Sequence, residues 1–128
     1  MSVPRRIVAF LDLAAQDAEA ARTLAATNNR YAAYHCQQAA EKLIKAILLH
    51  RGAESGTEHR LDMLVDELSD GDPWKAKLRL LETYSPYATA YRYPTPGGRI
   101  VTAPDMAKVA VDADAIEALI KEARAGLK

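Results

Sequence analysis

The stretch Tyr31-Ala-Ala-Tyr34-His35-Cys36-Gln37-Gln38-Ala39-Ala40-Glu41-Lys42-Leu43-Ile44-Lys45-Ala46 decides the fold of this chain. It consists mainly of strong helix formers, above all alanine, and it contains neither glycine nor proline. An apolar seam follows the three- and four-residue spacing of one helix face at Ala33, Cys36, Ala40, Leu43 and Ile47. We therefore predict a long amphipathic helix over residues 30–51, with Gly52 as its C-terminal cap.

The same helical spacing recurs on both sides of this stretch. It predicts helices over residues 3–27 and 59–69, a short helix that begins at Pro73 and is disturbed at Pro86, and a last helix after Asp105. No segment alternates apolar and polar residues as a half-buried strand would. We therefore expect an all-α fold, an antiparallel up-and-down bundle of four to five helices that forms one domain over residues 1–128.

Turn and capping residues separate these segments. Asn28-Asn29 predicts a tight turn in which one of the two asparagines caps the next helix, and Asp72-Pro73 predicts an N-cap followed by proline at the first helical position. Prolines and glycines keep residues 91–103 out of a helix, and Ile100-Val101 is expected to form a short extended piece. Thr102-Ala103-Pro104-Asp105 has the pattern of a capping box before the last helix.

Charge and hydropathy exclude several classes of protein. The formal net charge is zero, whereas a protein that binds nucleic-acid backbones over a wide surface carries a large positive excess, so only a local basic patch stays open. The N-terminal segment lacks the uninterrupted apolar region of a signal peptide, and no apolar run is long enough to cross a membrane. We therefore expect a soluble, cytoplasmic protein without a membrane partner.

The counts of cysteine and histidine bear on metal sites and disulfides. Cys36 is the only cysteine and falls among apolar helical positions, so we interpret it as a core residue. One cysteine excludes a disulfide within the chain, and three separated histidines beside it make a poor zinc site. No phosphate-binding glycine loop occurs. We expect neither a metal ion nor a cofactor.

Three motifs give the chain a resemblance to a known family. The stretch quoted above resembles the signature helix of HEPN domains, in which an aromatic residue precedes Gln-Gln-Ala-Ala-Glu-Lys and Leu-x-Lys-Ala follows. His59, with leucines after it, is similar to the family's His-x-Leu-x-x-Leu third helix, and Tyr91-Arg92-Tyr93-Pro94 is similar to its Arg-Tyr-Pro element before the last helix. The order and spacing of all three motifs match over roughly residues 5–124.

The resemblance implies an antiparallel helical bundle, commonly a homodimer, that is tied to nucleotides or RNA. Members are often encoded beside a minimal nucleotidyltransferase or fused to one, and some pairs act as toxin and antitoxin. Other members of the superfamily are metal-independent ribonucleases in which arginine, four to six spacers and histidine from two subunits meet in one cleft. Such a histidine can transfer protons near neutral pH, while the arginine stabilises charge that develops on the phosphate.

Two arginine–histidine pairs bear on the ribonuclease alternative. Arg30 and His35 match the spacing, but five positions along a helix place two side chains about 140° apart, so we interpret them as a surface residue and a half-buried packing residue. Arg51 and His59 have one spacer more than the pattern allows and are catalytic candidates if the intervening loop brings them together. In the alternative reading, His59 caps the third helix or bonds to Glu41 or to the preceding loop.

A polar stripe follows the helical period on another face of the quoted stretch, at Tyr34, Gln38, Glu41 and Lys45. Glu41 and Lys45 stand in the favourable order for an ion pair between residues four apart. An exposed stripe of this kind is either solvated surface or a face that presents amide, carboxylate and ammonium groups to a ligand or a second subunit. The resemblance favours the second interpretation, so these four residues are candidates for ligand or partner binding.

Arg92 and Tyr93 complete the candidate binding residues. Arginine can hold a phosphate through two parallel hydrogen bonds, and an aromatic ring can stack on a base. Alternatively, Arg92 reaches back to Glu41 or to a helix C-terminus and pins its loop, while Tyr93 packs on the bundle.

The sequence therefore predicts a binding module that binds a nucleotide, partners a minimal nucleotidyltransferase in a toxin–antitoxin-like system, or does both. Two alternatives stay open. One is a metal-independent endoribonuclease toxin, and the other is a structural interaction module with no nucleotide ligand.

Overall fold

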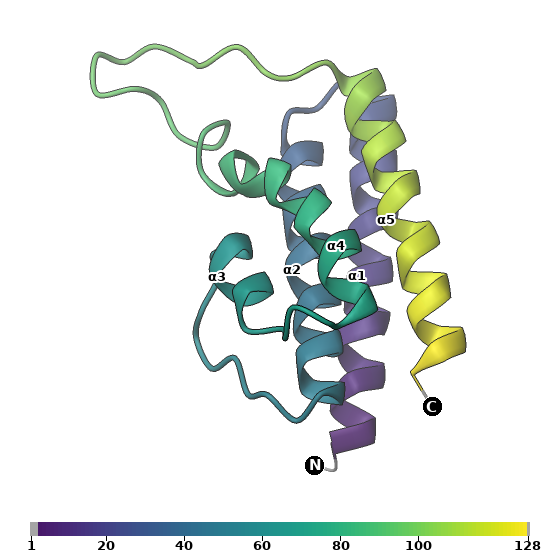
Figure 1. The fold of residues 1–128 in the computed structure, drawn as a ribbon. Helices are drawn as coiled ribbons and strands as arrows, with labels where there is room; N and C mark the ends of the chain where they lie inside the picture. The colour runs from purple at the N-terminus through teal and green to yellow at the C-terminus, as the bar shows by residue number, and fades with distance from the viewer. Residues whose placement is uncertain (1–2, 128) are drawn as a thin grey trace.

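The computed structural model describes residues 3–127 and is helical throughout, with no strand among those residues. The elements are α1 (Val3–Ala26), α2 (Tyr31–His50), α3 (Leu61–Asp66), α4 (Pro73–Arg79), a 3₁₀ helix η1 (Leu80–Ala88) and α5 (Met106–Gly126). Figure 1 shows α1, α2 and α5 as long neighbouring helices, with α2 and α5 running opposite to α1. This arrangement confirms the predicted all-α bundle.

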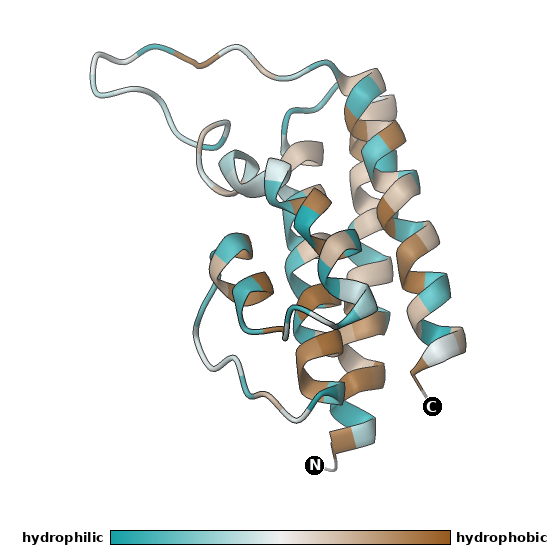
Figure 2. Ribbon diagram, in the orientation of Figure 1, coloured by the Kyte–Doolittle hydropathy of each residue, from teal (hydrophilic) through white to brown (hydrophobic). Residues whose placement is uncertain are grey.

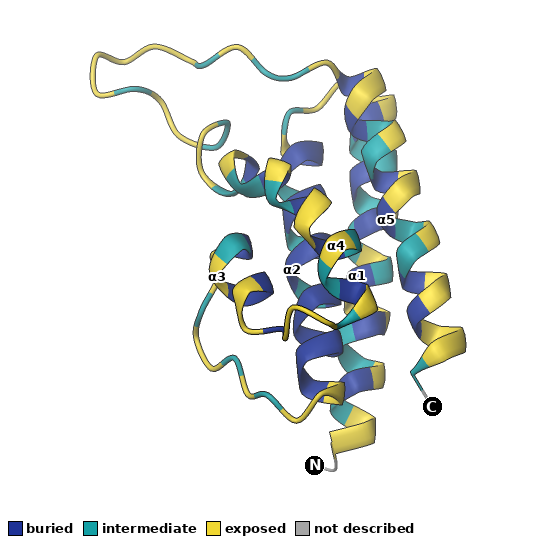
Figure 3. Cartoon of the chain, in the orientation of Figure 1, coloured by how far each residue is buried: buried dark blue, intermediate teal, exposed yellow. Residues whose placement is uncertain are grey.

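The position of α2 in the bundle matters most for the site. It packs against α1 and α5 on one side and against α3 and η1 on the other. α2 is consequently buried along most of its length, which Figure 3 shows in dark blue, although Figure 2 shows hydrophilic residues along the same helix. A helix in this position must satisfy its polar side chains through other protein groups.

The two ends of α2 follow from local sequence. Asn28 adopts a left-handed backbone conformation with φ of 56°, and the side-chain oxygen of Asn29 accepts a hydrogen bond from the Tyr31 amide at 3.0 Å. At the other end, Gly52 has φ of +84°, and the Gly52 and Ala53 amides bond to the carbonyls of Leu49 and Leu48. The predicted asparagine turn and glycine cap are both present. The N-cap residue of α2 is Arg30, however, and not one of the two asparagines.

The third helix is shorter than predicted. It spans Leu61–Asp66 rather than residues 59–69, and His59 lies in the loop before it. The carboxylate of Glu58 accepts hydrogen bonds from the amides of His59 and Arg60, which stabilises a turn there instead of helix. At the C-terminal end, the amides of Glu67 and Leu68 donate to the carbonyls three residues earlier, those of Leu64 and Val65. These 3₁₀-type bonds tighten the last turn and end the helix. Of the alternatives for His59, capping of the third helix does not occur, because Arg60 is the N-cap residue, whereas the bond to Glu41 is present.

The chain between α3 and α5 confirms one capping prediction and corrects another. Asp72 caps α4 by accepting a hydrogen bond from the Trp74 amide at 2.9 Å, as predicted. Pro86 lies within η1, where the chain has already changed from α to 3₁₀ geometry. The predicted capping box at residues 102–105 is wrong, because Asp105 is itself the N-cap of α5. Pro104 disfavours helical geometry at Ala103, which a capping box at Thr102 would require as the first helical residue.

The core consists of the facing sides of the long helices and the apolar sides of the short ones. The seam of α2 is fully buried, and around α3 the apolar side chains of Leu61, Leu64, Val65 and Leu68 are buried as well. On α1 the buried positions are mostly alanines, namely Ala14, Ala18, Ala21 and Ala25, which allow α2 to approach closely. Cys36 lies in this core, and burial raises the pKa of its thiol to about 12, as expected for an inert packing residue.

Within residues 3–127, no helix is long and apolar enough to cross a membrane. The same residues contain no group of three or more histidine, cysteine, aspartate or glutamate side chains that could hold a metal ion.

Candidate functional site

A polar cleft of about 290 Å³ lies between α2 and the end of η1, and we call it the α2 cleft. Its walls come from three parts of the chain that are distant in sequence: α2, the loop before α3, and the segment that follows η1. The lining residues are Tyr34, Gln37, Gln38, Glu41, His59, Ala88, Thr89 and Arg92. Four of the six predicted binding residues and one predicted catalytic candidate therefore meet in one place.

The polar stripe of α2 is not exposed, which corrects the sequence-based expectation. Tyr34 and Gln38 are half-buried, whereas Glu41 is 5% exposed and Lys45 8%. The neighbouring Gln37 is buried as well, at 2%. α3 and η1 cover this side of α2, and one sequence alone cannot reveal that cover. Buried amide and charged groups are tolerated only when hydrogen bonds or opposite charges compensate them.

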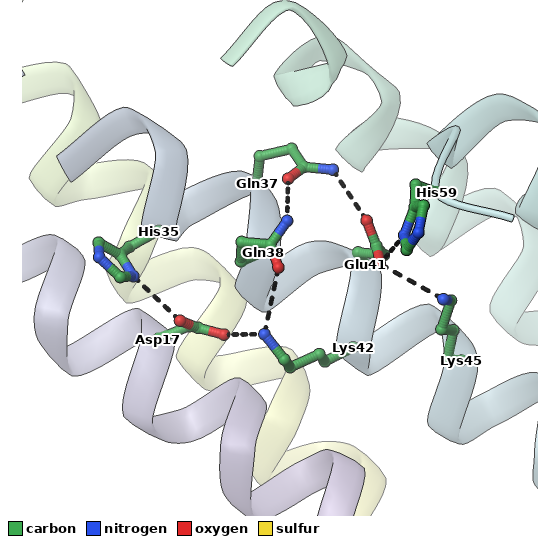
Figure 4. A network of polar contacts seen from close by, with 8 residues as sticks. All are labelled: Asp17, His35, Gln37, Gln38, Glu41, Lys42, Lys45 and His59. Carbon is green, nitrogen blue, oxygen red and sulfur yellow. Dashed lines mark hydrogen bonds and ion pairs between the residues drawn. The ribbon is translucent and has the colours of Figure 1, made fainter. Parts of the chain in front are cut away.

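Glu41 provides that compensation at the centre of the stripe. One carboxylate oxygen accepts a hydrogen bond from the Gln37 amide at 3.3 Å. The other lies 2.9 Å from Nδ1 of His59 and 3.4 Å from the ammonium group of Lys45. The predicted Glu41–Lys45 ion pair is present, as is the contact between His59 and Glu41. Figure 4 shows Glu41 between these three partners.

The hydrogen bonds continue from the cleft towards α1. Gln38 donates to the side-chain oxygen of Gln37 at 2.8 Å, and Lys42 donates to the side-chain oxygen of Gln38 at 3.3 Å. Asp17 on α1 then accepts from both Lys42 and His35, at 2.5 and 3.0 Å. A continuous polar network thus links α1 to the loop before α3 across α2 (Figure 4).

His59 is the most accessible member of this network, with a side chain that is 72% exposed. Nδ1 donates a hydrogen bond to the carboxylate of Glu41. The second ring nitrogen, Nε2, is not used in this contact and is available to a ligand. A carboxylate behind an imidazole fixes its tautomer and orientation. His59 can therefore accept a hydrogen bond or take up a proton at the mouth of the cleft.

Arg92 also lines the cleft. Its guanidinium donates to the Ala88 carbonyl at the end of η1 and to the Tyr93 hydroxyl, at 2.8 and 3.0 Å. It also lies over the ring of Tyr34, 4.2 Å from the ring centroid. Arg92 thus reaches a helix C-terminus, one of the two predicted arrangements, but Tyr93 remains 59% exposed and does not pack on the bundle.

Arg51 lies apart from this cleft. Its guanidinium makes two hydrogen bonds to Asp72, at 2.6 and 3.2 Å, and a contact to His50. These bonds raise the pKa of Arg51 and lower that of Asp72. Since His59 instead contacts Glu41, the structure does not join Arg51 and His59 as a pair.

The other arginine–histidine pair is also separated in the structure. Arg30 donates to the Val101 carbonyl at 2.5 Å, whereas His35 bonds to Asp17. His35 is half-buried, as predicted for a packing residue, and Arg30 is half-buried too rather than a surface residue.

Sequence reasoning missed Gln37, Ala88 and Thr89 in the cleft wall, and Lys42 and Asp17 in the polar network. Gln37 is buried in the cleft wall, and its spacing of four from Glu41 was a usable signal for the hydrogen bond between them. Asp17 connects the network to α1, and nothing in its local sequence distinguishes it from a solvated acidic residue.

Comparison with known proteins connects the chain to a family. A family model described as HEPN domain matches residues 8–125, nearly the whole chain. No curated protein and no solved structure shows a significant match.

Proposed function

Because the chain belongs to the HEPN domain family, we propose that it is a nucleotide-binding module whose ligand occupies the α2 cleft. One observation carries this proposal. Residues from three distant segments form a single cleft that combines amides, an accessible imidazole and a guanidinium. Amide groups are suited to the polar edge of a base, and a guanidinium is suited to a phosphate.

The charges around the cleft support an anionic ligand. Glu41 is neutralised by Lys45 and bonded to His59, so its negative charge is already compensated. Within residues 3–127, by contrast, Arg92 forms no ion pair with a carboxylate, and only two of its five N–H groups are used. A phosphate at Arg92 would complete its hydrogen bonds.

Thermal unfolding in the presence of nucleotides tests this proposal. A ligand that binds only the native state raises its melting temperature, and saturation at 100 times Kd adds about 2.7 kcal/mol of stability. We expect the four ribonucleoside monophosphates, at millimolar concentration, to include at least one that raises the melting temperature. His59→Ala should reduce the shift, whereas Leu80→Ala, which changes an exposed residue outside the cleft, should not.

The absence of any shift would contradict nucleotide binding. It would support the alternative of an interaction module without a nucleotide ligand.

A partner and a second subunit belong to the same proposal. We propose a cytoplasmic homodimer that acts with a minimal nucleotidyltransferase in a toxin–antitoxin-like system, as the family resemblance implies. Exposed apolar residues on α1, including Val8 and Leu13, give a physical ground for dimerisation. Sedimentation at micromolar concentration should give twice the chain mass, and a monomer at that concentration would contradict the proposed dimer.

The proposed nucleotidyltransferase partner is tested separately, by co-purification with a co-expressed nucleotidyltransferase.

Metal-independent RNA cleavage is a second candidate, favoured by one specific observation. His59 is oriented by Glu41 and shares the cleft with Arg92, so a proton-transfer group and a phosphate-binding group lie together. Cleavage of RNA in the presence of a chelator, lost in His59→Ala but kept in His35→Ala, would establish it. If the parent protein does not cleave RNA, nucleotide binding is the only role that this proposal keeps.

A further inference from the structure

We propose that the root of the loop over residues 91–103 forms a second subsite, which stacks a base adjacent to the nucleotide held in the α2 cleft. The ligand would then be a single-stranded chain of at least two nucleotides rather than a mononucleotide. This inference rests on the proposed function of the α2 cleft and extends it to a neighbouring cavity of about 370 Å³.

The two cavities adjoin at one residue. Arg92 lines both, and its guanidinium lies over Tyr34 in the α2 cleft and over Tyr93 in the second cavity, at 4.2 and 5.1 Å from the ring centroids. A group that stands between two sites, with three N–H groups left over, is placed to hold the phosphate that joins two nucleotides.

The charge of the second cavity fits this role. Arg30 and Arg92 line it and no carboxylate does. Neither arginine is paired with a carboxylate anywhere in residues 3–127, whereas Arg6, Arg22, Arg51, Arg60, Arg79 and Arg124 all are. The zero net charge of the chain therefore conceals a local positive region at this end of the bundle.

Aromatic rings supply the stacking surfaces. Tyr31, Tyr91 and Tyr93 all line the cavity. Tyr91 is held edge-on by the buried Tyr87, with ring centroids 5.6 Å apart, whereas Tyr31 and Tyr93 are 46% and 59% exposed. Arginines interleaved with accessible aromatic rings, without acidic groups, are typical of surfaces that bind single-stranded nucleic acid.

The cavity is held in place by hydrogen bonds, although its loop projects from the bundle in Figure 1. Arg30 at the start of α2 donates to the Val101 carbonyl at 2.5 Å, which ties the returning part of the loop to the helix. Within the loop, Thr95 and Arg99 are joined by a backbone bond of 2.8 Å, and Gly98 closes the turn with φ of +81°. These bonds fix the chain on both sides of the cavity.

Binding titrations with ligands of different length test the second subsite. The ligands are the four ribonucleoside 5′-monophosphates and the matching 5′-phosphorylated dinucleotides, and the variants are Tyr93→Ala, Tyr31→Ala and His59→Ala. Tyr31→Phe keeps the ring and is the matched control for Tyr31→Ala, while Leu80→Ala controls for loss of an exposed apolar side chain. Circular dichroism melts confirm that each variant is folded.

We expect dinucleotides to bind more tightly than monophosphates. Loss of one stacking ring costs about 5- to 150-fold in affinity, so Tyr93→Ala and Tyr31→Ala should weaken dinucleotide binding by that range. Tyr31→Ala should leave monophosphate binding unchanged, because Tyr31 lines the second cavity and not the α2 cleft, whereas His59→Ala should weaken binding of both ligands. Tyr31→Phe should behave like the parent protein.

Three results would overturn the second subsite. If monophosphates bind but dinucleotides bind no more tightly, the inference fails while the proposed function stands. If Tyr31→Ala weakens binding of both ligands equally, the cavity holds the first nucleotide and is not a second subsite. If neither ligand binds the parent protein, the proposed function fails and the inference fails with it.

Discussion

Two flanks of α2 are equally buried but chemically opposite. The apolar flank carries the seam Ala33, Cys36, Ala40, Leu43 and Ile47, and the polar flank carries the row Gln37, Glu41 and Lys45. The apolar flank needs no partners beyond close packing, because its burial is favourable in itself. The polar row needs a carboxylate, an amide and an ammonium group in mutual contact to offset the loss of their water.

The difference teaches that burial alone does not reveal what a residue contributes. A buried ion pair contributes little net stability compared with apolar residues of the same size, since desolvation cancels most of the attraction. The polar row therefore has no evident advantage for folding. Its advantage lies in orienting His59 and the glutamines at the wall of the α2 cleft, which an apolar row could not do.

Breaking the polar row should give the largest effect on stability. Glu41→Leu leaves the ammonium group of Lys45 buried without a carboxylate, which should lower the free energy of unfolding by about 3–5 kcal/mol. Urea unfolding measures this loss.

The double variant Glu41→Leu/Lys45→Met sharpens the comparison further. Because it removes both charges, it should regain most of that stability, yet it should not bind nucleotide. A double variant as unstable as the single one would show that the row is needed for folding.

An equivalent change on the apolar flank should affect stability without affecting the site. Leu43 is fully buried, so Leu43→Ala removes apolar contacts and leaves a cavity, at a cost of about 2–5 kcal/mol. The protein that remains folded should bind nucleotide with unchanged affinity, as measured by titration well below its melting temperature. Loss of affinity in the folded variant would mean that the two flanks are coupled.

Removal of Asp72, which pairs with Arg51 at the end of α2, should have an intermediate effect on stability. Asp72 also caps α4, so Asp72→Ala should cost about 0.5–2 kcal/mol, the usual range for loss of an N-cap.

The pH dependence of this effect has a definite sign. The hydrogen bond from Arg51 lowers the pKa of Asp72 in the folded state below its unfolded value of about 3.9. The contribution of Asp72 to the free energy of unfolding is therefore complete above about pH 5, and it is lost as the pH falls through the pKa of Asp72 in the folded state. Unfolding curves from pH 3 to pH 7 should show the difference between the parent protein and Asp72→Ala narrowing only in acid. A difference that narrows towards neutral pH would contradict this assignment.

His59→Ala should have the smallest effect on stability. The imidazole is largely exposed, and Glu41 keeps Gln37 and Lys45 as partners, so we expect a change within about 0.5 kcal/mol. Urea unfolding of this variant, beside the nucleotide titrations, would separate folding from binding at one residue. A loss of several kcal/mol would mean that His59 supports the fold rather than the site.

Local signals in the sequence predicted the helices and most of their ends. The asparagine turn, the glycine cap at Gly52 and the Asp72 cap each depend on a few consecutive residues. The errors arose where two local preferences compete. Pro104 prevents α5 from beginning at a capping box, and Glu58 stabilises a turn where helical spacing predicted the start of α3.

Several residues of the candidate site were predictable from the sequence, but their arrangement was not. The period of α2 placed Gln38 and Glu41 on one face, and family resemblance singled out His59 and Arg92. Their convergence depends on how the loop before α3 and the segment after η1 fold back onto α2. Arg51 could equally have belonged to the site by sequence, yet it lies with Asp72 instead.

The sequence by itself determined which segments are helical, because helix formation and capping depend on neighbours within one or two turns. Tertiary structure alone decided which helical faces are covered and which distant side chains meet. The contact of His59 with Glu41, 18 positions apart, and the bond from Arg30 to Val101, 71 positions apart, exist only after the bundle closes. Such pairs carry no local signal, since their interaction depends on packing rather than on spacing along the chain.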